Sequence, residues 1–345
     1  MGPGAWSEGV VQDAAELGAL MPYERASRTY NRIAGVAISA NSIRRVVDVE
    51  GTGWARIEQQ AAETTWKPPE KEAVPAPREM IQADSPRMNV SLDGTTIHIR
   101  GEGWKEVKTA TFSALVEDEQ ARKRRKRRKK AASSDSEPAV RLTQHSYRAG
   151  LWDARRFEKQ QWAEAKRRGV PAAEELLSIN DGAIWIWRII LTCYPQAIEI
   201  VDWWHAVERL WQVGHLVYGQ DSSVGAAWVK IQETALWHGD VESVIEACQA
   251  LMPARAEAIE YVRQSIGYFE TNRERMRYAQ FRAAGYPIGS GAVEGGGCKM
   301  VVGGRMKQAG MRWSRRGAQA VLALRTAWFS DRWDEVWARS NRSAA

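Results

Sequence analysis

The sequence predicts an α/β protein with a mixed central sheet, and three features of its pattern lead to this prediction. Apolar and polar residues alternate over 89–100, which is typical of a strand, and two further candidate strands follow within 106–149. From 154 to 218 helical and strand patterns alternate along the chain, which indicates parallel strands joined by helices. Residues 224–282 have a helical pattern throughout. We therefore expect a sheet domain made of 87–223 and 283–330, interrupted by an all-helical insertion at 224–282.

Residues 1–50 are predicted to form a helical N-terminal region. One candidate helix begins at Tyr23 and ends at Ala34, and Gly35 marks a turn. Ser39 is a suitable N-cap for a second helix that runs through Asp48. Two short helices with a glycine between them are typical of a helix-turn-helix that binds DNA, and equally of a helical hairpin in a core. The sequence leaves both interpretations open.

Within the sheet domain the expected elements follow a regular order. Strands are predicted at 89–100, 106–116 and 141–149, then a helix at 154–168, a strand at 175–179, a helix at 183–192, a strand at 197–201 and a helix at 203–218. This is the order of a ribonuclease H-like domain. Residues 51–86 are polar and Pro-rich and are predicted to be a linker, and 331–345 are expected to be a C-terminal tail.

Charge is concentrated in two segments of the chain. The 345 residues include 49 Lys and Arg and 42 Asp and Glu, a net charge of +7. The run 122–130 holds nine basic residues, and without it the balance is 40 against 42, or −2. A second segment, 299–316, holds six basic residues and no acid. Such concentration favours a polyphosphate partner, with a solvated loop as the alternative for the first run.

The cysteine pattern and the hydropathy exclude several protein classes. The three cysteines, at 193, 248 and 298, form no Cys-x-x-Cys pair, so neither a zinc ribbon nor a disulfide framework is indicated. No signal peptide is visible, and the apolar stretch 183–193 is interrupted by Arg188 and is too short to span a bilayer. We expect a soluble cytoplasmic protein, associated with the nucleoid and without a membrane partner.

Three acidic residues have the placement of a metal site. Asp93 lies in the first predicted strand, Asp181 ends a later strand, and Glu294 lies in a glycine-rich segment. Taken singly, each is as typical of a turn or a helix start. Converging carboxylates repel one another unless cations balance them, and two Mg²⁺ (or Mn²⁺) ions are the usual solution in polymerases and nucleases. One ion would activate the attacking water or 3′-hydroxyl, and the other would stabilise the leaving oxygen.

Three stretches carry a resemblance to a known family. They are SLDGTTIHIR with GWKEVKTATFSALVE (91–117), INDGAIWIW (179–187) and YPIGSGAVEGGGCKMVVGGRMKQAGMRWSRRGAQAVLALR (286–325). Over about 89–328 the chain resembles bacterial insertion-sequence transposases of the DDE type, in particular the ISKra-like group, which is related to the Mutator-like transposases. The resemblance implies that Asp93, Asp181 and Glu294 are the metal-binding triad. It further implies double-stranded DNA substrates (transposon ends and target) and a homo-oligomer.

The same resemblance extends to Asp202 and His205. Related transposases carry a Cys or Asp, two residues and then a His shortly after the second catalytic Asp. The resemblance therefore implies that Asp202 and His205 support the active site or the DNA strand. Positions three apart share a helix face, so a purely structural Asp–His pair is equally open.

The basic segments supply the predicted DNA contacts. Basic side chains with an aromatic among them suit phosphate contacts and one base stack, and the alternative is a solvated helix face with Trp313 in the core. The predicted DNA-binding residues are Arg122, Lys123, Arg124, Arg125, Lys126, Lys299, Arg305, Lys307, Arg312, Trp313, Arg315 and Arg316.

One departure from the family concerns the N-terminus. Family members usually carry a longer N-terminal region, often with Cys pairs, and this chain starts at MGPGAWSEG without them. We therefore expect this chain to be a truncated or internally started copy of such a transposase. The sequence therefore predicts a transposase that cleaves transposon ends and transfers strands. The alternatives are a ribonuclease H-like nuclease without strand transfer and a non-catalytic DNA-binding remnant.

Overall fold

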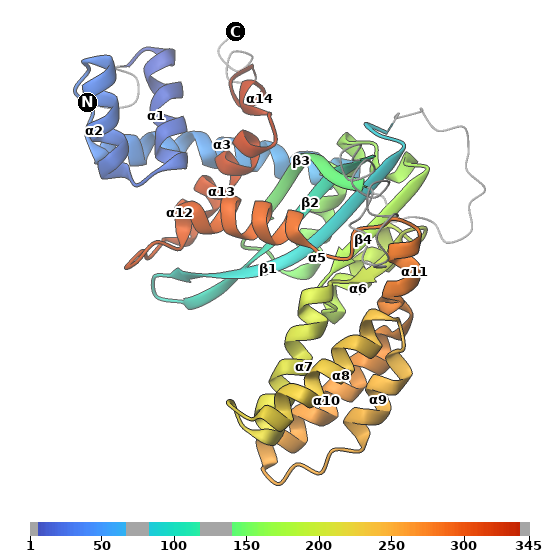
Figure 1. Ribbon diagram of the computed structural model, residues 1–345. Helices are drawn as coiled ribbons and strands as arrows, with labels where there is room; N and C mark the ends of the chain where they lie inside the picture. The colour runs from blue at the N-terminus through green and yellow to red at the C-terminus, as the bar shows by residue number, and fades with distance from the viewer. Residues whose placement is uncertain (1–5, 67–82, 118–139, 339–345) are drawn as a thin grey trace, which may run out of the picture.

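The computed structural model describes residues 6–66, 83–117 and 140–338. Its centre is a five-stranded mixed sheet in the order β3-β2-β1-β4-β5, which confirms the predicted α/β class (Figure 1). Two antiparallel pairings join β1 to β2 and β2 to β3, and two parallel pairings join β1 to β4 and β4 to β5. The strands are β1 (Arg87–Ile99), β2 (Gly103–Glu117), β3 (Val140–Gly150), β4 (Glu175–Asn180) and β5 (Ile198–Val201).

The two faces of the sheet pack against different helices. Successive side chains of a strand point to opposite faces, so Leu92 and Ile97 of β1 belong to different cores. Leu92 lies in a core with residues of α5, α6 and α7, whereas Ile97 lies in a core with residues of α1, α3, α13 and the π-helix η4. These helices are α5 (Ala154–Arg167), α6 (Ile184–Cys193), α7 (Trp203–Tyr218), η4 (Ala292–Gly303) and α13 (Arg315–Phe329).

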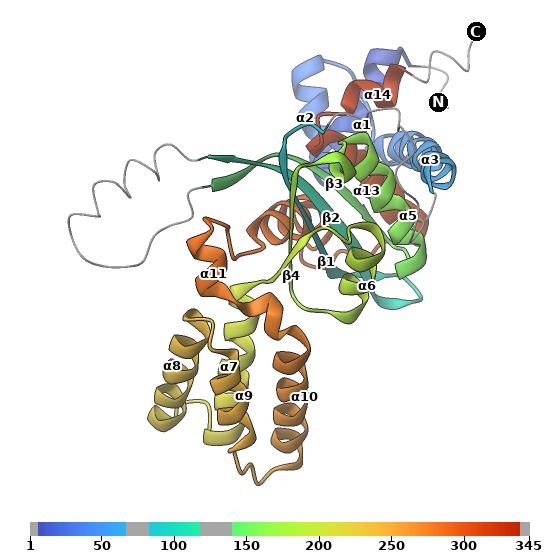
Figure 2. The same ribbon diagram turned by 90° about the vertical axis from the view of Figure 1, so that its right-hand side faces the viewer.

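The chain between β5 and η4 forms a helical bundle that projects from the sheet (Figures 1 and 2). The neighbours α7–α8, α8–α9, α9–α10 and α10–α7 all contact one another. An aromatic cluster lies in the same core, where the Trp203 ring meets the rings of Trp237 and Tyr278 edge-on with centroids 5.0 Å apart. The further elements are α8 (Ser223–Trp237), α9 (Val241–Gln249), α10 (Ala256–Asn272), η3 (Arg273–Met276) and α11 (Tyr278–Ala283).

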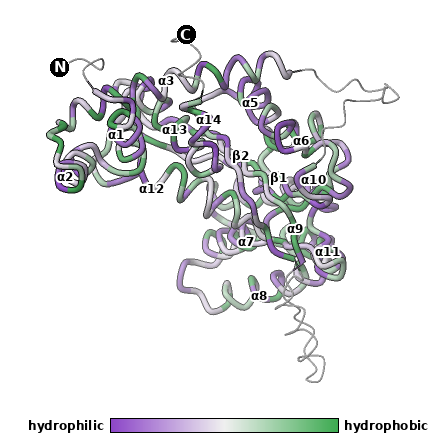
Figure 3. The backbone as a smooth tube through the Cα atoms, turned by 90° about the horizontal axis from the view of Figure 1, so that it is seen from above, coloured by the Kyte–Doolittle hydropathy of each residue, from purple (hydrophilic) through white to green (hydrophobic). Residues whose placement is uncertain are grey.

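The N-terminal helices are part of the protein's second core. They are α1 (Glu8–Leu20), α2 (Tyr23–Ala34) and α3 (Ala40–Thr65). Buried residues of α1 and α3, among them Ala15, Ile43 and Val47, share one apolar cluster with β1 and α13. Hydropathy along the chain shows the two-sided character of these helices, which mix hydrophobic and hydrophilic residues (Figure 3). This region is therefore packed on the sheet domain.

The predicted end of the second helix at Asp48 is wrong, and so is the predicted start of the linker at residue 51; residues 67–82 of the predicted linker lie outside the described residues. α3 continues to Thr65 because its buried face continues, with Trp54 and Ala62 fully enclosed. Gly51 does not break the helix. It is the point where α3 meets α13, and a Cβ at this position would collide with the backbone of Ala320.

The prediction of a plain C-terminal tail is also corrected. A short helix, α14 (Trp333–Ala338), buries Val336 and Trp337 in the second core. A network of buried ion pairs lies beside it: Arg332 meets Glu58 of α3 at 3.2 Å and Glu164 of α5 at 3.3 Å, and Glu58 also pairs with Arg148 of β3. The network ties α3, β3 and α5 to the residue that precedes α14.

None of the helices in the described part of the chain combines the length and the apolar run that crossing a bilayer requires.

Candidate active site

The two predicted aspartates lie at the junction of the parallel strands. Asp93 is in β1, opposite Thr109 of β2, and Asp181 directly follows β4. The backbone N–H of Leu92 donates to Oδ1 of Asn180 at 2.7 Å, which fixes the residue before each aspartate against the other strand. Asp93 and Asp181 are close enough for the charge of Asp181 to raise the pKa of Asp93.

The carboxylate of Asp93 is partly buried and held by two donors. Cys298 donates its thiol to Oδ2 at 3.1 Å, and the N–H of Gly94 donates to Oδ1 at 2.6 Å. Burial raises the pKa of Asp93, and these two hydrogen bonds and the nearby His205 offset only part of that effect. Sequence reasoning did not find Cys298, although its place four residues after Glu294 is a helical spacing.

Asp181 is held by the start of α6 and by the helical bundle. Its Oδ1 accepts from the N–H of Ala183 at 2.9 Å, and its backbone carbonyl accepts from the hydroxyl of Tyr268 at 3.0 Å. Gly182 has a φ of +93°, and Tyr268 of α10 lies directly against it. The guanidinium of Arg209 stands 4.3 Å above the Tyr268 ring. Sequence reasoning missed Tyr268, because no local pattern connects it to a residue 87 positions away.

Glu294 enters the site from η4, which approaches the sheet closely. A Cβ at Gly297 would lie 2.5 Å from Cγ2 of Thr109 on β2, so only glycine permits this distance. The hydroxyl of Ser290 donates to Oε1 of Glu294 at 2.7 Å. Ser290 was also missed, and its only signal is its position four residues before Glu294.

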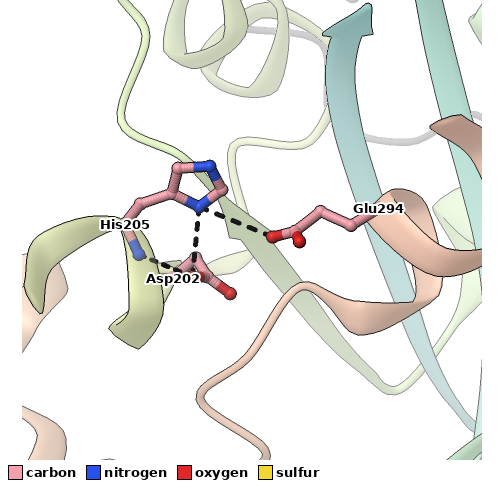
Figure 4. Close-up of side chains that lie close together, drawn as sticks. All are labelled: Asp202, His205 and Glu294. Carbon is pink, nitrogen blue, oxygen red and sulfur yellow. Dashed lines mark hydrogen bonds and ion pairs between the residues drawn. The ribbon is translucent and has the colours of Figure 1, made fainter. Parts of the chain in front are cut away.

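Asp202, His205 and Glu294 converge in one cluster (Figure 4). Oδ1 of Asp202 accepts a hydrogen bond from the backbone N–H of His205 at 2.9 Å, so Asp202 is the N-cap of α7. The same oxygen lies 3.1 Å from Nδ1 of the His205 ring. The same Nδ1 lies 3.5 Å from Oε1 of Glu294. Oδ2 of Asp202 accepts from the N–H of Ser290. The structure thus brings the two predicted accessory residues to the third predicted acid.

Electrostatics makes His205 a cation at neutral pH. The hydrogen bond with Asp202 raises the pKa of His205 to about 9 against the opposing effect of burial, and the charges of Asp202, Glu294 and Asp181 add to the rise. Burial alone would raise the pKa of Asp202, but hydrogen bonds from His205 and Ser290 outweigh it and lower that pKa. One positive imidazole therefore partly offsets several neighbouring carboxylates.

The spacing of Asp202, His205 and Glu294 would suit a metal ion, and among the described residues neither Asp93 nor Asp181 belongs to this group. Each of the three residues offers one ligand atom, and these three atoms all lie within 4.8 Å of one another. The carboxylates are the hard oxygen donors that Mg²⁺ prefers. His205 can coordinate only as the neutral imidazole, and its raised pKa disfavours that form at pH 7. Oxygen ligation is therefore the better match.

The predicted DNA-binding residues fall into three groups. Lys299, Arg312 and Arg316 are exposed. Lys307 and Arg315 are exposed too, but each has a partner within the protein. Lys307 donates a hydrogen bond to Thr95 at 2.8 Å, and Arg315 forms an ion pair with Glu102 at 2.6 Å. The residues predicted from the first basic run, Arg122, Lys123, Arg124, Arg125 and Lys126, lie outside the described residues.

Trp313 corrects the prediction of an aromatic that stacks on a base, and Arg305, predicted as a phosphate contact, is buried as well. Arg305 is 1% exposed, donates to the carbonyl of Gly18 at 3.2 Å, and lies between the rings of Tyr23 and Trp313 at 4.8 Å from each centroid. Trp313 is 7% exposed, and its indole N–H donates to the carbonyl of Met306 at 3.1 Å. The alternative that placed Trp313 in the core is the observed one.

Comparison with known proteins adds no family: no protein-family model matches the chain, and no curated protein matches it.

Proposed function

We propose that the chain is a DDE-type transposase that cuts transposon-end DNA and joins it to target DNA. One observation carries the proposal: Asp93 and Asp181 lie on neighbouring parallel strands, and a helix packed on the same sheet places Glu294 within reach of His205, whose pKa responds to the charges of Glu294 and Asp181. Acids from three distant segments thus share one electrostatic environment. Such arrangements are concentrated at functional sites.

A ribonuclease H-like architecture is part of this proposal. The order β1, β2, β3, α5, β4, α6, β5, α7 is the order that the sequence analysis expected of such a domain. In this interpretation the bundle α8–α10 is an insertion before the helix that carries Glu294. Its Tyr268 reaches back to the carbonyl of Asp181, which couples the insertion to the site.

The donor set suits divalent cations. Asp93 is partly buried with a raised pKa, so a nearby cation would favour its charged form. Asp93, Asp181 and Glu294 would hold two Mg²⁺ or Mn²⁺ ions. When bound, such ions lower the pKa of an attacking water or 3′-hydroxyl and stabilise the leaving oxygen of an in-line displacement.

Within this function, Asp202 and His205 are positioning residues. Asp202 fixes the imidazole through Oδ1 and fixes Ser290 through Oδ2. His205 and Ser290 then approach the same oxygen, Oε1 of Glu294. The pair therefore orients Glu294 from two sides, and the protonated imidazole adds a positive charge beside the phosphodiester.

DNA is the proposed partner. Lys299, Lys307, Arg312 and Arg316 place exposed positive charge on the segment that follows Glu294, and such charge supplies salt-sensitive affinity for phosphates. Transposases synapse two ends, so we propose a homo-oligomer as the working form.

A joining assay tests this function against simple nuclease activity. Purified chain is incubated with plasmid and a labelled duplex that ends in a pre-cut 3′-hydroxyl, taken from the DNA flanking its gene. The proposal expects Mg²⁺- or Mn²⁺-dependent nicking and covalent transfer of the label to plasmid. Asp93→Asn should reduce both by about 10³-fold or more. Asp221→Asn, a matched change at an exposed position between α7 and α8, should leave both unchanged.

Each outcome has a distinct meaning. Nicking without label transfer identifies a nuclease that lacks strand transfer. DNA binding without metal-dependent nicking identifies a non-catalytic DNA-binding protein. Full activity in Asp93→Asn contradicts the assignment of the triad.

A further inference from the structure

A cavity lies away from the candidate active site, where the N-terminal helices meet the end of β1. Its volume is about 290 Å³, at the lower end of the range for small-ligand sites. Four arginines and one acid contribute to its lining: Arg44, Arg100, Arg305, Arg312 and Asp48. Four positive charges against one negative charge leave a net charge of +3 on the lining. A cavity of this size and sign suits a small anionic group.

The charge of three of these arginines is not neutralised by a nearby acid. Asp48 pairs with Arg44 at 3.3 Å and so offsets that charge. Arg100, Arg305 and Arg312 form no ion pair with any residue that the structure describes. A buried cation without a counter-charge is costly, and burial lowers the pKa of the Arg305 guanidinium. An anion in the cavity would relieve this cost.

The backbone around the cavity adds to its preference for anions. Ser314 lines the cavity and is the N-cap of α13, a 15-residue helix with no acid in its first turn. The positive end of the helix dipole therefore faces this region. Arg305 is fixed between the Tyr23 and Trp313 rings, so its charge is preorganised rather than mobile.

We propose that this cavity binds a phosphate group of a DNA strand. The proposal takes its partner from the proposed function, and it adds a contact remote from the cleaved bond. Arg100 follows β1 directly, seven residues after Asp93, which is roughly 23 Å along an extended strand. At 3.4 Å per base pair this corresponds to about seven base pairs of duplex between the cavity and the scissile phosphate.

A DNA-binding assay in EDTA tests the proposal without requiring cleavage. Fluorescence anisotropy measures the affinity for a labelled duplex at several salt concentrations. The test variant is Arg100→Gln with Arg312→Gln, because both side chains are exposed and lack ion pairs with described residues. The slope of log affinity against log salt should become shallower by about one, with an affinity loss of about 5–10-fold at 0.1 M salt. The control Arg263→Gln makes a single substitution of the same type on α10, where Arg263 pairs with Glu260 of its own helix, and should keep the wild-type slope.

Two results would overturn the proposal. The first is an unchanged slope and affinity in the folded double variant, as judged by its circular dichroism and melting temperature. The second is calorimetric binding of inorganic phosphate or a mononucleotide that the double substitution abolishes while DNA affinity stays the same, because the ligand is then a small phosphate compound. Since no metal is present, loss of the cleavage function cannot produce either result. If the wild-type protein fails to cut DNA but the double variant shows a shallower salt slope, the phosphate site is supported and only the catalytic proposal is contradicted.

Discussion

Nδ1 of His205 lies 3.5 Å from Oε1 of Glu294, although the two residues belong to separate elements, α7 and η4. The contact exists because Asp202 caps α7 with one carboxylate oxygen and binds the N–H of Ser290 with the other. Ser290 lies one turn before Glu294 and donates to it. A buried aspartate therefore sets the relative position of the helix that carries His205 and the helix that carries Glu294.

Replacing His205 should impair catalysis without unfolding the protein. His205→Gln removes the positive charge beside Glu294, and outer-shell changes of this kind typically cost 10–100-fold. We expect DNA nicking to fall by about 10–100-fold while duplex affinity in EDTA changes little. The matched control is His238→Gln, at an exposed position that ends α8. Wild-type nicking rates in His205→Gln would show that the Asp202–His205 pair is only structural.

Gly51 and Gly53 of α3 offer a paired test of the helix contact that the sequence did not reveal. A Cβ at Gly51 would collide with the Ala320 backbone, whereas a Cβ at Gly53 has no atom within 4 Å. Gly51→Ala should lower the free energy of unfolding by about 1–3 kcal/mol through overpacking. Gly53→Ala should raise it by about 0.5–1 kcal/mol, because alanine favours a helix interior. Urea unfolding measures both, and equal effects would contradict the close α3–α13 packing.

Acid should destabilise the protein through Glu164. Burial alone would raise the pKa of Glu164, but the hydrogen bond and charge of Arg167 and the charge of Arg332 outweigh it and lower that pKa. A depressed folded-state pKa gives stability that is fully present above the unfolded value near 4.5 and is lost as pH falls through the lower folded value. Urea unfolding between pH 3 and pH 7 should show this loss.

Glu164→Gln should flatten that pH dependence and cost about 3 kcal/mol at pH 7, since it removes the buried carboxylate that Arg167 and Arg332 share and leaves Arg332 with Glu58 as its buried partner. The exposed Glu257→Gln on α10 serves as its control and should retain the wild-type profile. An unaltered pH profile in Glu164→Gln would mean that the network does not govern acid stability.

The strands and helices of the sheet domain were predictable because their patterns are local. Apolar and polar residues alternate along the sequence of β1, and the side-chain caps at Ser39 and Asp202 are likewise local features, although the fold buries long runs of both β1 and β2. The end of α3 was not predictable in this way. Gly51 resembles a helix break, and only its contact with Ala320 explains why the helix continues.

The candidate site was predicted in part. Asp93, Asp181 and Glu294 were proposed from strand ends and a glycine-rich segment, and Asp202 and His205 were implied by the family resemblance. Tyr268 depends on the return of α10 to β4, which no local pattern encodes.

The basic segment gave the least reliable predictions about individual residues. Composition identified 299–316 as positively charged, but it does not separate the exposed Arg312 from the buried Arg305. Burial of Arg305 depends on the rings of Tyr23 and Trp313, which come from different parts of the chain.

The central claim is that Asp93, Asp181 and Glu294 together hold divalent cations, and a Mn²⁺ titration tests it most directly. Free Mn²⁺ is followed by electron paramagnetic resonance with duplex DNA present. The account predicts two ions bound per chain for the wild type and for Asp221→Asn. In Asp93→Asn and in Asp181→Asn, the affinity for Mn²⁺ should fall by more than about 100-fold, which exceeds the loss typical of replacing a residue that only supports a metal ligand. Wild-type stoichiometry and affinity in both active-site variants would contradict the account.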